Sequence, residues 1–159
     1  MSSTLFVDAI EPNLSSGVHI AGHVIQVVQA TSQTGVIISS GANTWIDVFP
    51  SAVITPKSSS SKILVSHSAG GILAGADTAS LRLLRGGSVI WSCSRYGYAE
   101  LATYSSIPWQ CEYLDSPASS SSITYTFQIR TQTAGNLRHN DVHNSEPPTA
   151  TTTLMEIAQ

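Results

Sequence analysis

Short runs of alternating hydrophobic and polar residues recur along this chain and predict β-strands rather than helices. Alternation with a period of two places successive side chains on opposite faces of a sheet. Clusters of Gly, Pro, Asn, Asp or Ser separate the runs, as is usual in β-sandwiches and barrels. The pattern predicts strands near 35–39, 44–49, 51–55, 62–68, 79–85, 88–94, 107–113, 123–132 and 151–157.

Two local features are the most informative. The segment 123–132 has the cleanest alternation, and its large apolar side chains must share one face, which we expect to be the core face. Those side chains are Ile123, Tyr125, Phe127 and Ile129. The dipeptide Gly86-Gly87 predicts a two-residue hairpin turn, because both positions of such a turn need positive φ.

The run 61–68 predicts a strand with one core face and one mixed face. Ile63 and Val65 belong to the core face. The mixed face contains Lys62, Leu64 and Ser66, and we place His67 on it as well.

The last part of the chain predicts a loop followed by a closing strand. Segment 134–148 is polar and rich in turn residues, so we expect an exposed loop or a weak hairpin. Residues 151–157 then close the sheet, and Leu154, with Thr152 and Glu156 as further candidates, sets the register.

The first thirty residues differ from the rest and predict an attachment or oligomerisation segment (1–30) ahead of a head domain (31–159). Within 17–30 the alternation is imperfect, which indicates a strand covered on both faces. A lone monomer would leave this apolar segment exposed, whereas a closed symmetric oligomer would cover it. The residues expected to take part are Leu5, Val7, Val18, Ile20, Val24, Ile25 and Val27.

Composition indicates one all-β domain that does not bind nucleic acid. The 159 residues include 41 Ser and Thr but only 7 Lys and Arg, and the net charge is −3. A hydrophobic fraction of 42% with so few charges argues against disorder, and the chain lacks the basic stripe that nucleic acid requires. No stretch approaches the roughly 18 apolar residues of a membrane helix, so we expect neither membrane insertion nor an export signal.

The two cysteines leave two alternatives open. Cys93 and Cys111 are too few for a disulfide scaffold, and their spacing matches no metal-binding motif. They are either two thiols in or near the core or one cross-strand bridge.

Five segments follow one another in a pattern that covers nearly the whole chain: VDAIEPNLSSGVHIAGHVIQVVQA, ITPKSSSSKILV, LRLLRGGSVI, LDSPASSSSITYTFQIR and TTTLMEIAQ. This pattern resembles tail-fibre and fibre-like virion proteins of bacteriophages, notably those of cyanobacteria and marine hosts. The resemblance implies a short N-terminal attachment segment, a β-sandwich head, homotrimeric assembly and a role in host adsorption. We therefore expect an all-β fold with an antiparallel, jelly-roll-like β-sandwich head.

Histidines offer a weak metal hypothesis. His19 and His23 are four residues apart, as are His139 and His143, and on a helix this spacing can bind zinc. Neither pair lies in a helical pattern, so we interpret them as ordinary surface or interface histidines. Coordination from loops or across a three-fold axis is the alternative, and we predict no cofactor.

Catalytic motifs are missing from the sequence. No serine lies in a Gly-x-Ser-x-Gly turn, and no Gly-rich loop precedes a predicted helix. A glycosidase needs two carboxylates roughly 5–10 Å apart, for which the closest candidates in sequence are Glu112 and Asp115. We predict that the protein is not an enzyme.

Aromatic residues are concentrated between 91 and 113. We expect Trp91, Trp109 and Tyr113 to fill the core. The segment between Ser92 and Ile107 is too long for a tight hairpin and combines Tyr with Arg. These two residue types give recognition surfaces large rigid groups with polar ends. The receptor-contact candidates are Arg95, Tyr96, Tyr98 and Tyr104.

The sequence therefore favours a non-enzymatic virion protein, a short homotrimeric tail fibre that contributes to host adsorption. Its expected partners are other copies of itself, other tail, baseplate or capsid proteins, and a glycan or protein of the host surface. A capsid decoration or cement protein is the alternative, and a surface-polysaccharide hydrolase is a third, enzymatic one.

Overall fold

The computed structural model describes residues 20–38, 43–74, 77–99, 104–106, 108–132, 136–140 and 148–159. These residues contain no helix long and apolar enough to cross a bilayer. Their twelve strands are β1 (Val24–Ser32), β2 (Val36–Ile38), β3 (Ile46–Ile54), β4 (Lys62–Ala69), β5 (Gly71–Ala74), β6 (Asp77–Arg85), β7 (Ser88–Ala99), β8 (Tyr104–Ser106), β9 (Trp109–Asp115), β10 (Ile123–Thr131), β11 (Asn136–His139) and β12 (Ala150–Ile157).

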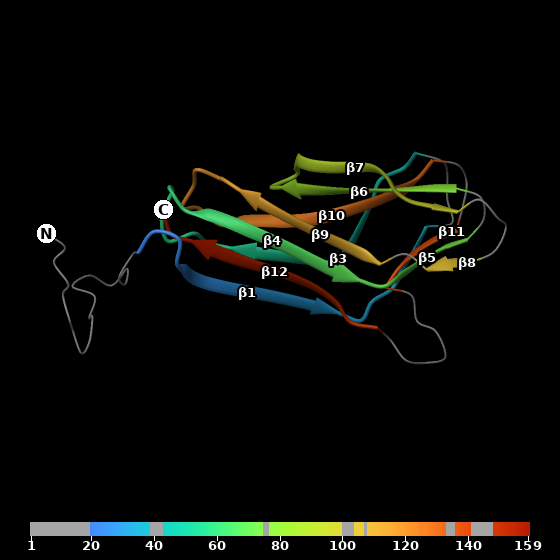
Figure 1. The fold of residues 1–159 in the computed structure, drawn as a ribbon, viewed down its shortest axis with the longest axis horizontal. Helices are drawn as coiled ribbons and strands as arrows, with labels where there is room; N and C mark the ends of the chain where they lie inside the picture. The colour runs from blue at the N-terminus through green and yellow to red at the C-terminus, as the bar shows by residue number, and fades with distance from the viewer. Residues whose placement is uncertain are drawn as a thin grey trace, which may run out of the picture.

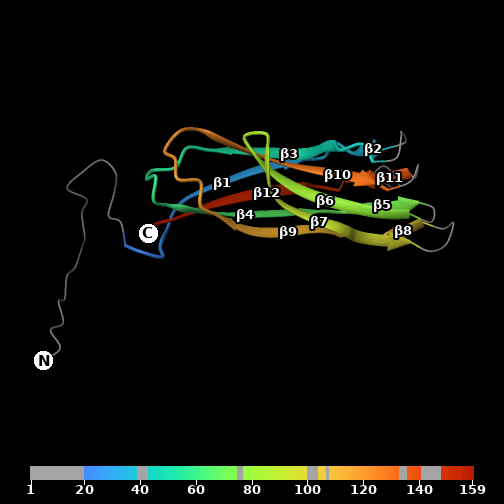
Figure 2. The same cartoon turned by 90° about the horizontal axis from the view of Figure 1, so that it is seen from above.

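Two four-stranded antiparallel sheets face each other, and a third sheet of short strands lies at the end of the sandwich opposite the C-terminus (Figures 1 and 2). One main sheet has the strand order β1-β12-β4-β9, and the other has the order β3-β10-β6-β7. The end sheet has the order β2-β11-β5-β8.

The strand pairing defines a jelly roll. Among the eight long strands in chain order, the first pairs with the last, the second with the seventh, the third with the sixth and the fourth with the fifth. The short pairs β2–β11 and β5–β8 lie where this two-stranded ribbon passes from one main sheet to the other. Such a ribbon wrapped into two facing sheets is the eight-stranded jelly roll, so the expected fold class is confirmed.

The core lies between the two main sheets. On β10 the four apolar residues that the alternation assigned to the core are buried, and Ile63 and Val65 of β4 face them from the other sheet. Trp109 is fully buried, whereas Trp91 and Tyr113 are half-buried and pack against the core. On the closing strand β12, the inward side chains include Thr152, Leu154 and Glu156, as the register prediction requires.

The Gly86-Gly87 turn has the predicted geometry. Both glycines have positive φ, +53° and +86°, and Arg85 pairs directly with Ser88 across the hairpin. This is the conformation that a two-residue turn between twisted strands needs.

A single strand, β3, replaces the two strands expected at 44–49 and 51–55. Pro50 lies inside β3, opposite the register shift between Tyr125 and Phe127 of β10. Because β3 is an edge strand, a residue without an N–H can be accommodated there.

Strands at the end of the sandwich differ most from the prediction. β7 runs to Ala99, beyond the expected end at residue 94, and β5 and β8 were not predicted. β5 and β8 have only four and three residues, which is too short for a recognisable alternation.

The expectation of an exposed loop or weak hairpin at 134–148 is wrong for residues 136–140. Residues 136–139 form β11, which lies between β2 and β5, and both His139 and Asn140 are fully buried. Asn140 donates its backbone N–H to the carbonyl of Gly70 at 2.7 Å and its side-chain amide to that of Ser32 at 3.1 Å. These tertiary hydrogen bonds satisfy the buried backbone N–H and the side-chain NH2 group of Asn140.

The placement of His67 on the mixed face of β4 is also wrong. His67 is an even number of residues from Ile63 and Val65, so its side chain enters the core and is only 2% exposed.

Strand β1 is the edge strand of one main sheet and pairs with β12 from Val24 to Ser32. Residues 24–30, which the sequence analysis grouped with the attachment segment, are thus part of the sandwich sheet. One face of β1 is exposed in the monomer rather than covered on both sides. Residues 1–19 lie outside the described part of the chain.

Candidate functional site

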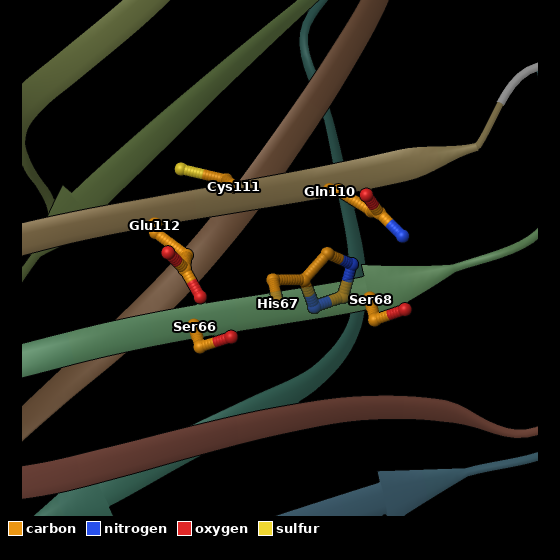
Figure 3. A pocket seen from close by; sticks show the side chains of 6 residues that line it. All are labelled: Ser66, His67, Ser68, Gln110, Cys111 and Glu112. Carbon is orange, nitrogen blue, oxygen red and sulfur yellow. The ribbon is translucent and has the colours of Figure 1, made fainter.

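An open hollow of about 450 Å³ lies between β4 and β9 on the outside of their sheet (Figure 3). Its lining comes from Ser66, His67, Ser68, Gln110, Cys111 and Glu112. Because side chains alternate, Ser66, Ser68, Gln110 and Glu112 face outward, whereas His67 and Cys111 belong to the buried face beneath. The hollow therefore presents hydroxyl, amide and carboxylate groups to a ligand.

The two inward residues of this hollow are not arranged for catalysis. The ring nitrogens of His67 are both engaged in the core, on the opposite face of β4 from Ser66 and Ser68. Burial raises the pKa of the Cys111 thiol to about 12, with smaller contributions from Cys93 and Glu112. The thiol is therefore protonated at neutral pH and is not an activated nucleophile.

A buried histidine pair joins one main sheet to the end sheet. Nε2 of His67 on β4 lies 3.1 Å from Nε2 of His139 on β11. The two ring planes are within 16° of each other, and the ring of His67 also stacks on Phe127 at a centroid distance of 4.4 Å. The pair thus lies where β4, β10 and β11 meet in the core.

Neighbouring groups fix the tautomers of both histidines. Thr152 donates its hydroxyl to the carbonyl of Pro50 at 2.7 Å, so its oxygen accepts from Nδ1–H of His67 at 2.9 Å. A neutral His67 then has an acceptor at Nε2, to which His139 donates Nε2–H. Within the described residues, Nδ1 of His139 has no partner.

Both histidines are neutral at ordinary pH. Burial lowers the pKa of His67 to about 3, and the adjacent His139 contributes in the same direction. Burial lowers the pKa of His139 to about 4. Nδ1 and Nε2 of His67 and Nε2 of His139 each point at another protein group, so the pair forms a structural hydrogen bond.

The metal hypothesis has no support in the part of the chain that is described. His19 and His143 lie outside the described residues, His23 is exposed, and His139 pairs with His67. Across the described ranges, no three His, Cys, Asp or Glu side chains come together. A structural or catalytic zinc site needs at least three such ligands.

The two carboxylates considered for glycoside cleavage lie on opposite faces of β9. Glu112 is exposed, whereas Asp115 is buried and accepts hydrogen bonds from both Arg85 and Tyr125. Three residues apart on a strand, they cannot flank one substrate. This arrangement does not provide the acid and base of a glycosidase.

For the receptor-contact candidates, the backbone is described but the side chains lie outside the described residues. Arg95, Tyr96 and Tyr98 belong to the distal half of β7, where Tyr98 pairs with Thr78. Tyr104 begins β8 and pairs with Ala74. These strands lie at the same end of the molecule (Figure 1). Because the side chains themselves are not described, their role in receptor recognition stays a prediction.

Cys93 and Cys111 are free thiols, which decides between the two alternatives left open by the sequence. Cys111 is buried and Cys93 is half-buried. They lie on β7 and β9, which belong to different sheets.

The apolar residues assigned to oligomerisation are only partly described. Leu5, Val7 and Val18 lie outside the described residues. Ile20, Val24 and Val27 are exposed, at 43%, 51% and 57%, and Ile25 is half-buried. The described members are therefore accessible to a partner.

The sequence did not predict the buried pair or the outward-facing hollow. The parity of His67 with Ile63 and Val65 was an available signal for the former. No comparable signal existed for His139, because the segment that contains it is polar and short.

Fold and site together define an all-β jelly-roll domain with a polar hollow on the outside of the β4–β9 pair. No family model and no curated protein matches the chain. Among solved structures, it is similar to the infectious bursal disease virus Gt strain, with 13% identity and a TM-score of 0.44 over 98% of this chain and 43% of that one. The VP2 subviral particle of infectious bursal disease virus gives 14% identity and a TM-score of 0.42, covering 98% and 42%. The chain thus spans about two fifths of the length of these matches.

Proposed function

We propose that this protein is a non-enzymatic structural component of a virus particle, a short homotrimeric tail fibre whose heads contribute to host adsorption. The observation that carries the proposal is the exposed apolar edge at β1. The resemblance of the sequence to phage tail fibres supports a location in the virion, a position at the tail and trimeric assembly.

The apolar edge supports assembly because natural proteins cover or pair such strands. β1 pairs with β12 on one side, and on its other side the described residues contribute no strand to its sheet. Val24 and Val27 are more than half exposed there, where Lys or Pro would block association. A second copy or another particle protein would cover this edge.

The hydroxyl-rich outer surface supports a passive role. The outward side chains along β4 and β12 include Ser66, Ser68, Thr151 and Thr153, and the hollow between β4 and β9 contains no activated nucleophile. Jelly rolls of this kind are frequent in viral capsid and lectin domains. A fold of this class supports a function only together with a site, which is why assembly is the property to test.

Localisation in purified particles tests the proposal. Antibody labelling viewed by electron microscopy is expected at the tail, and an antibody against the chain is expected to reduce adsorption to the host. Labelling on the head would assign the protein to capsid decoration. Its absence from purified particles would refute a structural role in the virion.

A further inference from the structure

A cluster of one tryptophan and two arginines lies on the outside of the β3-β10-β6-β7 sheet. The guanidinium carbon of Arg82 lies 4.2 Å from the ring centroid of Trp45, and that of Arg130 lies 4.7 Å from it. Trp45 directly precedes β3, whereas Arg82 and Arg130 belong to β6 and β10. Such distances are those of cation–π contacts, so the ring holds both cations on one surface.

The positive charge of this cluster is only partly balanced. Arg82 donates Nε–H to Oε1 of Gln128 at 2.6 Å, and Gln128 donates to Oδ1 of Asp47 at 2.6 Å. The carboxylate of Asp47 is therefore linked to Arg82 only through the side-chain amide of Gln128. Partial burial lowers the pKa of Arg82, and the charge of Arg130 lowers it further, while Asp47 raises it. Among the described side chains, the two cations thus share one indirect counter-charge, that of Asp47.

Arg130 is the less compensated of the two cations. Its Nε is shielded from solvent and has no hydrogen-bond partner among the described residues. A partly desolvated cation with no directly paired counter-ion, as for Arg130 among the described residues, costs free energy, which a bound anion at its guanidinium would reduce.

A hollow of about 210 Å³ adjoins Arg130 at the end of the sheet nearest β2 and β11. Its lining is Asn43, Thr78, Ser80, Ser94, Arg130 and Gln132. Apart from Arg130, all of these side chains offer hydroxyl or amide groups. The volume is below that of pockets for drug-sized ligands and fits a group of about one sugar ring.

A β-bulge forms one wall of this hollow. The register of β7 against β6 shifts between Ala79 and Leu81, whose partners are Gly97 and Cys93. Ser94 lies in this shift, and the backbone of Arg95 and Tyr96 passes through it. Bulges redirect side chains and are frequent beside binding sites.

From this geometry we infer a binding site for a carboxylated saccharide, such as a uronic-acid residue, beside Trp45, Arg82 and Arg130. The guanidinium of Arg130 pairs with the sugar carboxylate, since planar guanidinium groups bind carboxylates through two parallel hydrogen bonds. The hydroxyl and amide groups of the hollow pair with the sugar hydroxyls. A ligand that has only a carboxylate, or only sugar hydroxyls, would satisfy only part of the site.

Calorimetric titration of the full-length protein with a uronic-acid trisaccharide tests the site. A neutral trisaccharide of the same linkage and sodium acetate serve as the comparison ligands. The acidic trisaccharide is expected to bind at least about tenfold more tightly than either, because it alone combines a charge-assisted pair at Arg130 with hydroxyl contacts in the hollow. Equal affinities for the three ligands, or no binding of the acidic one, would overturn the inference.

Variants of Arg130 and Lys57 test where the acidic trisaccharide binds. Arg130→Gln is expected to weaken the acidic trisaccharide at least about tenfold, and Arg130→Lys to weaken it less, because lysine keeps the charge but loses the planar fork. Lys57→Gln removes the same charge beyond the opposite end of β3 and is expected to leave the affinity unchanged. An equal loss in Lys57→Gln would indicate general charge attraction and refute the site. The measurement uses isolated protein, so its outcome is independent of where the protein lies in a particle.

Discussion

The phenolic oxygen of Tyr125 lies 2.6 Å from Oδ2 of Asp115, and this buried hydrogen bond joins the two facing sheets. Tyr125 belongs to β10 and Asp115 to β9. Arg85 on β6 donates from Nη1 to both carboxylate oxygens at 3.0 and 3.1 Å. Burial raises the pKa of Tyr125, and the hydrogen bond to Asp115 adds to the effect. The cluster thus cross-links the sandwich near the Gly86-Gly87 hairpin.

Removing the phenolic hydroxyl tests the strength of this link. Tyr125→Phe is expected to lower the free energy of unfolding by about 1–3 kcal/mol, because Asp115 loses a buried donor while the aromatic ring still fills the core. Urea denaturation provides the measurement. Glu112→Gln, at an exposed position of the same strand β9, is the control and is expected to change stability by less than about 0.5 kcal/mol. Equal stability of Tyr125→Phe and wild type would contradict a stabilising role for the hydrogen bond between Tyr125 and Asp115.

The His67–His139 pair predicts a loss of stability in mild acid. Unfolded histidine binds a proton near pH 6.5, whereas the folded pKa values are about 3 and about 4. Between pH 6.5 and 4.5 the unfolded state therefore binds more protons, and stability falls as the pH falls. At about 1.4 kcal/mol per pKa unit, two histidines over this interval amount to a loss on the order of 5 kcal/mol.

Nitrogen chemical shifts measured by NMR test the pair without a core substitution. Both buried rings are expected to stay neutral at pH 5, with the proton on Nδ1 of His67 and on Nε2 of His139. Titration of either buried ring near pH 6.5 would refute the proposed protonation state.

Alternation alone predicted the parts of the fold whose burial follows the sequence period. β10 and the Gly86-Gly87 turn are such cases, because four large apolar residues and two adjacent glycines leave few conformations open. The burial of His139 could not be predicted, since it depends on the hydrogen bond that His139 donates to His67 of β4 and on the position of β11 between β2 and β5. Short strands in the end sheet likewise depend on tertiary pairing rather than on local pattern.

The candidate binding surfaces were harder to predict than the core. Outward positions of a strand tolerate many residue types, so Arg82 and Arg130 have no distinctive spacing in the sequence. Trp45, which brings them together, lies at least 37 residues before either one along the chain. Only the alignment of β3, β10 and β6 places the three side chains on one face.

Gly71 is expected to be intolerant of any side chain. A Cβ at this position would overlap Nε1 of Trp109 and lie 2.6 Å from the carbonyl oxygen of Arg138. Gly71→Ala should therefore lower the free energy of unfolding by about 1–3 kcal/mol or more, as overpacking of a core does. The adjacent Gly70→Ala is a matched control, since its Cβ meets nothing within 4 Å. Urea midpoints that fall equally in the two variants would contradict this prediction.

Lysine substitutions at the edge of β1 should dissociate the proposed oligomer while leaving the fold intact. Val24 and Val27 are 51% and 57% exposed, so a double variant Val24→Lys/Val27→Lys removes no core side chain. Charges on an edge strand oppose pairing with another chain, and a three-fold assembly would bring three copies of them together. Light scattering at micromolar concentration is expected to show a trimer for the wild type and a monomer for the double variant. Far-UV circular dichroism is expected to show the same β-rich spectrum for both, because the substituted side chains lie outside the core. Val89→Lys, at a similarly exposed valine beside the hairpin, should remain trimeric. A monomeric wild type, or a double variant that stays trimeric, would refute the role of β1 in assembly.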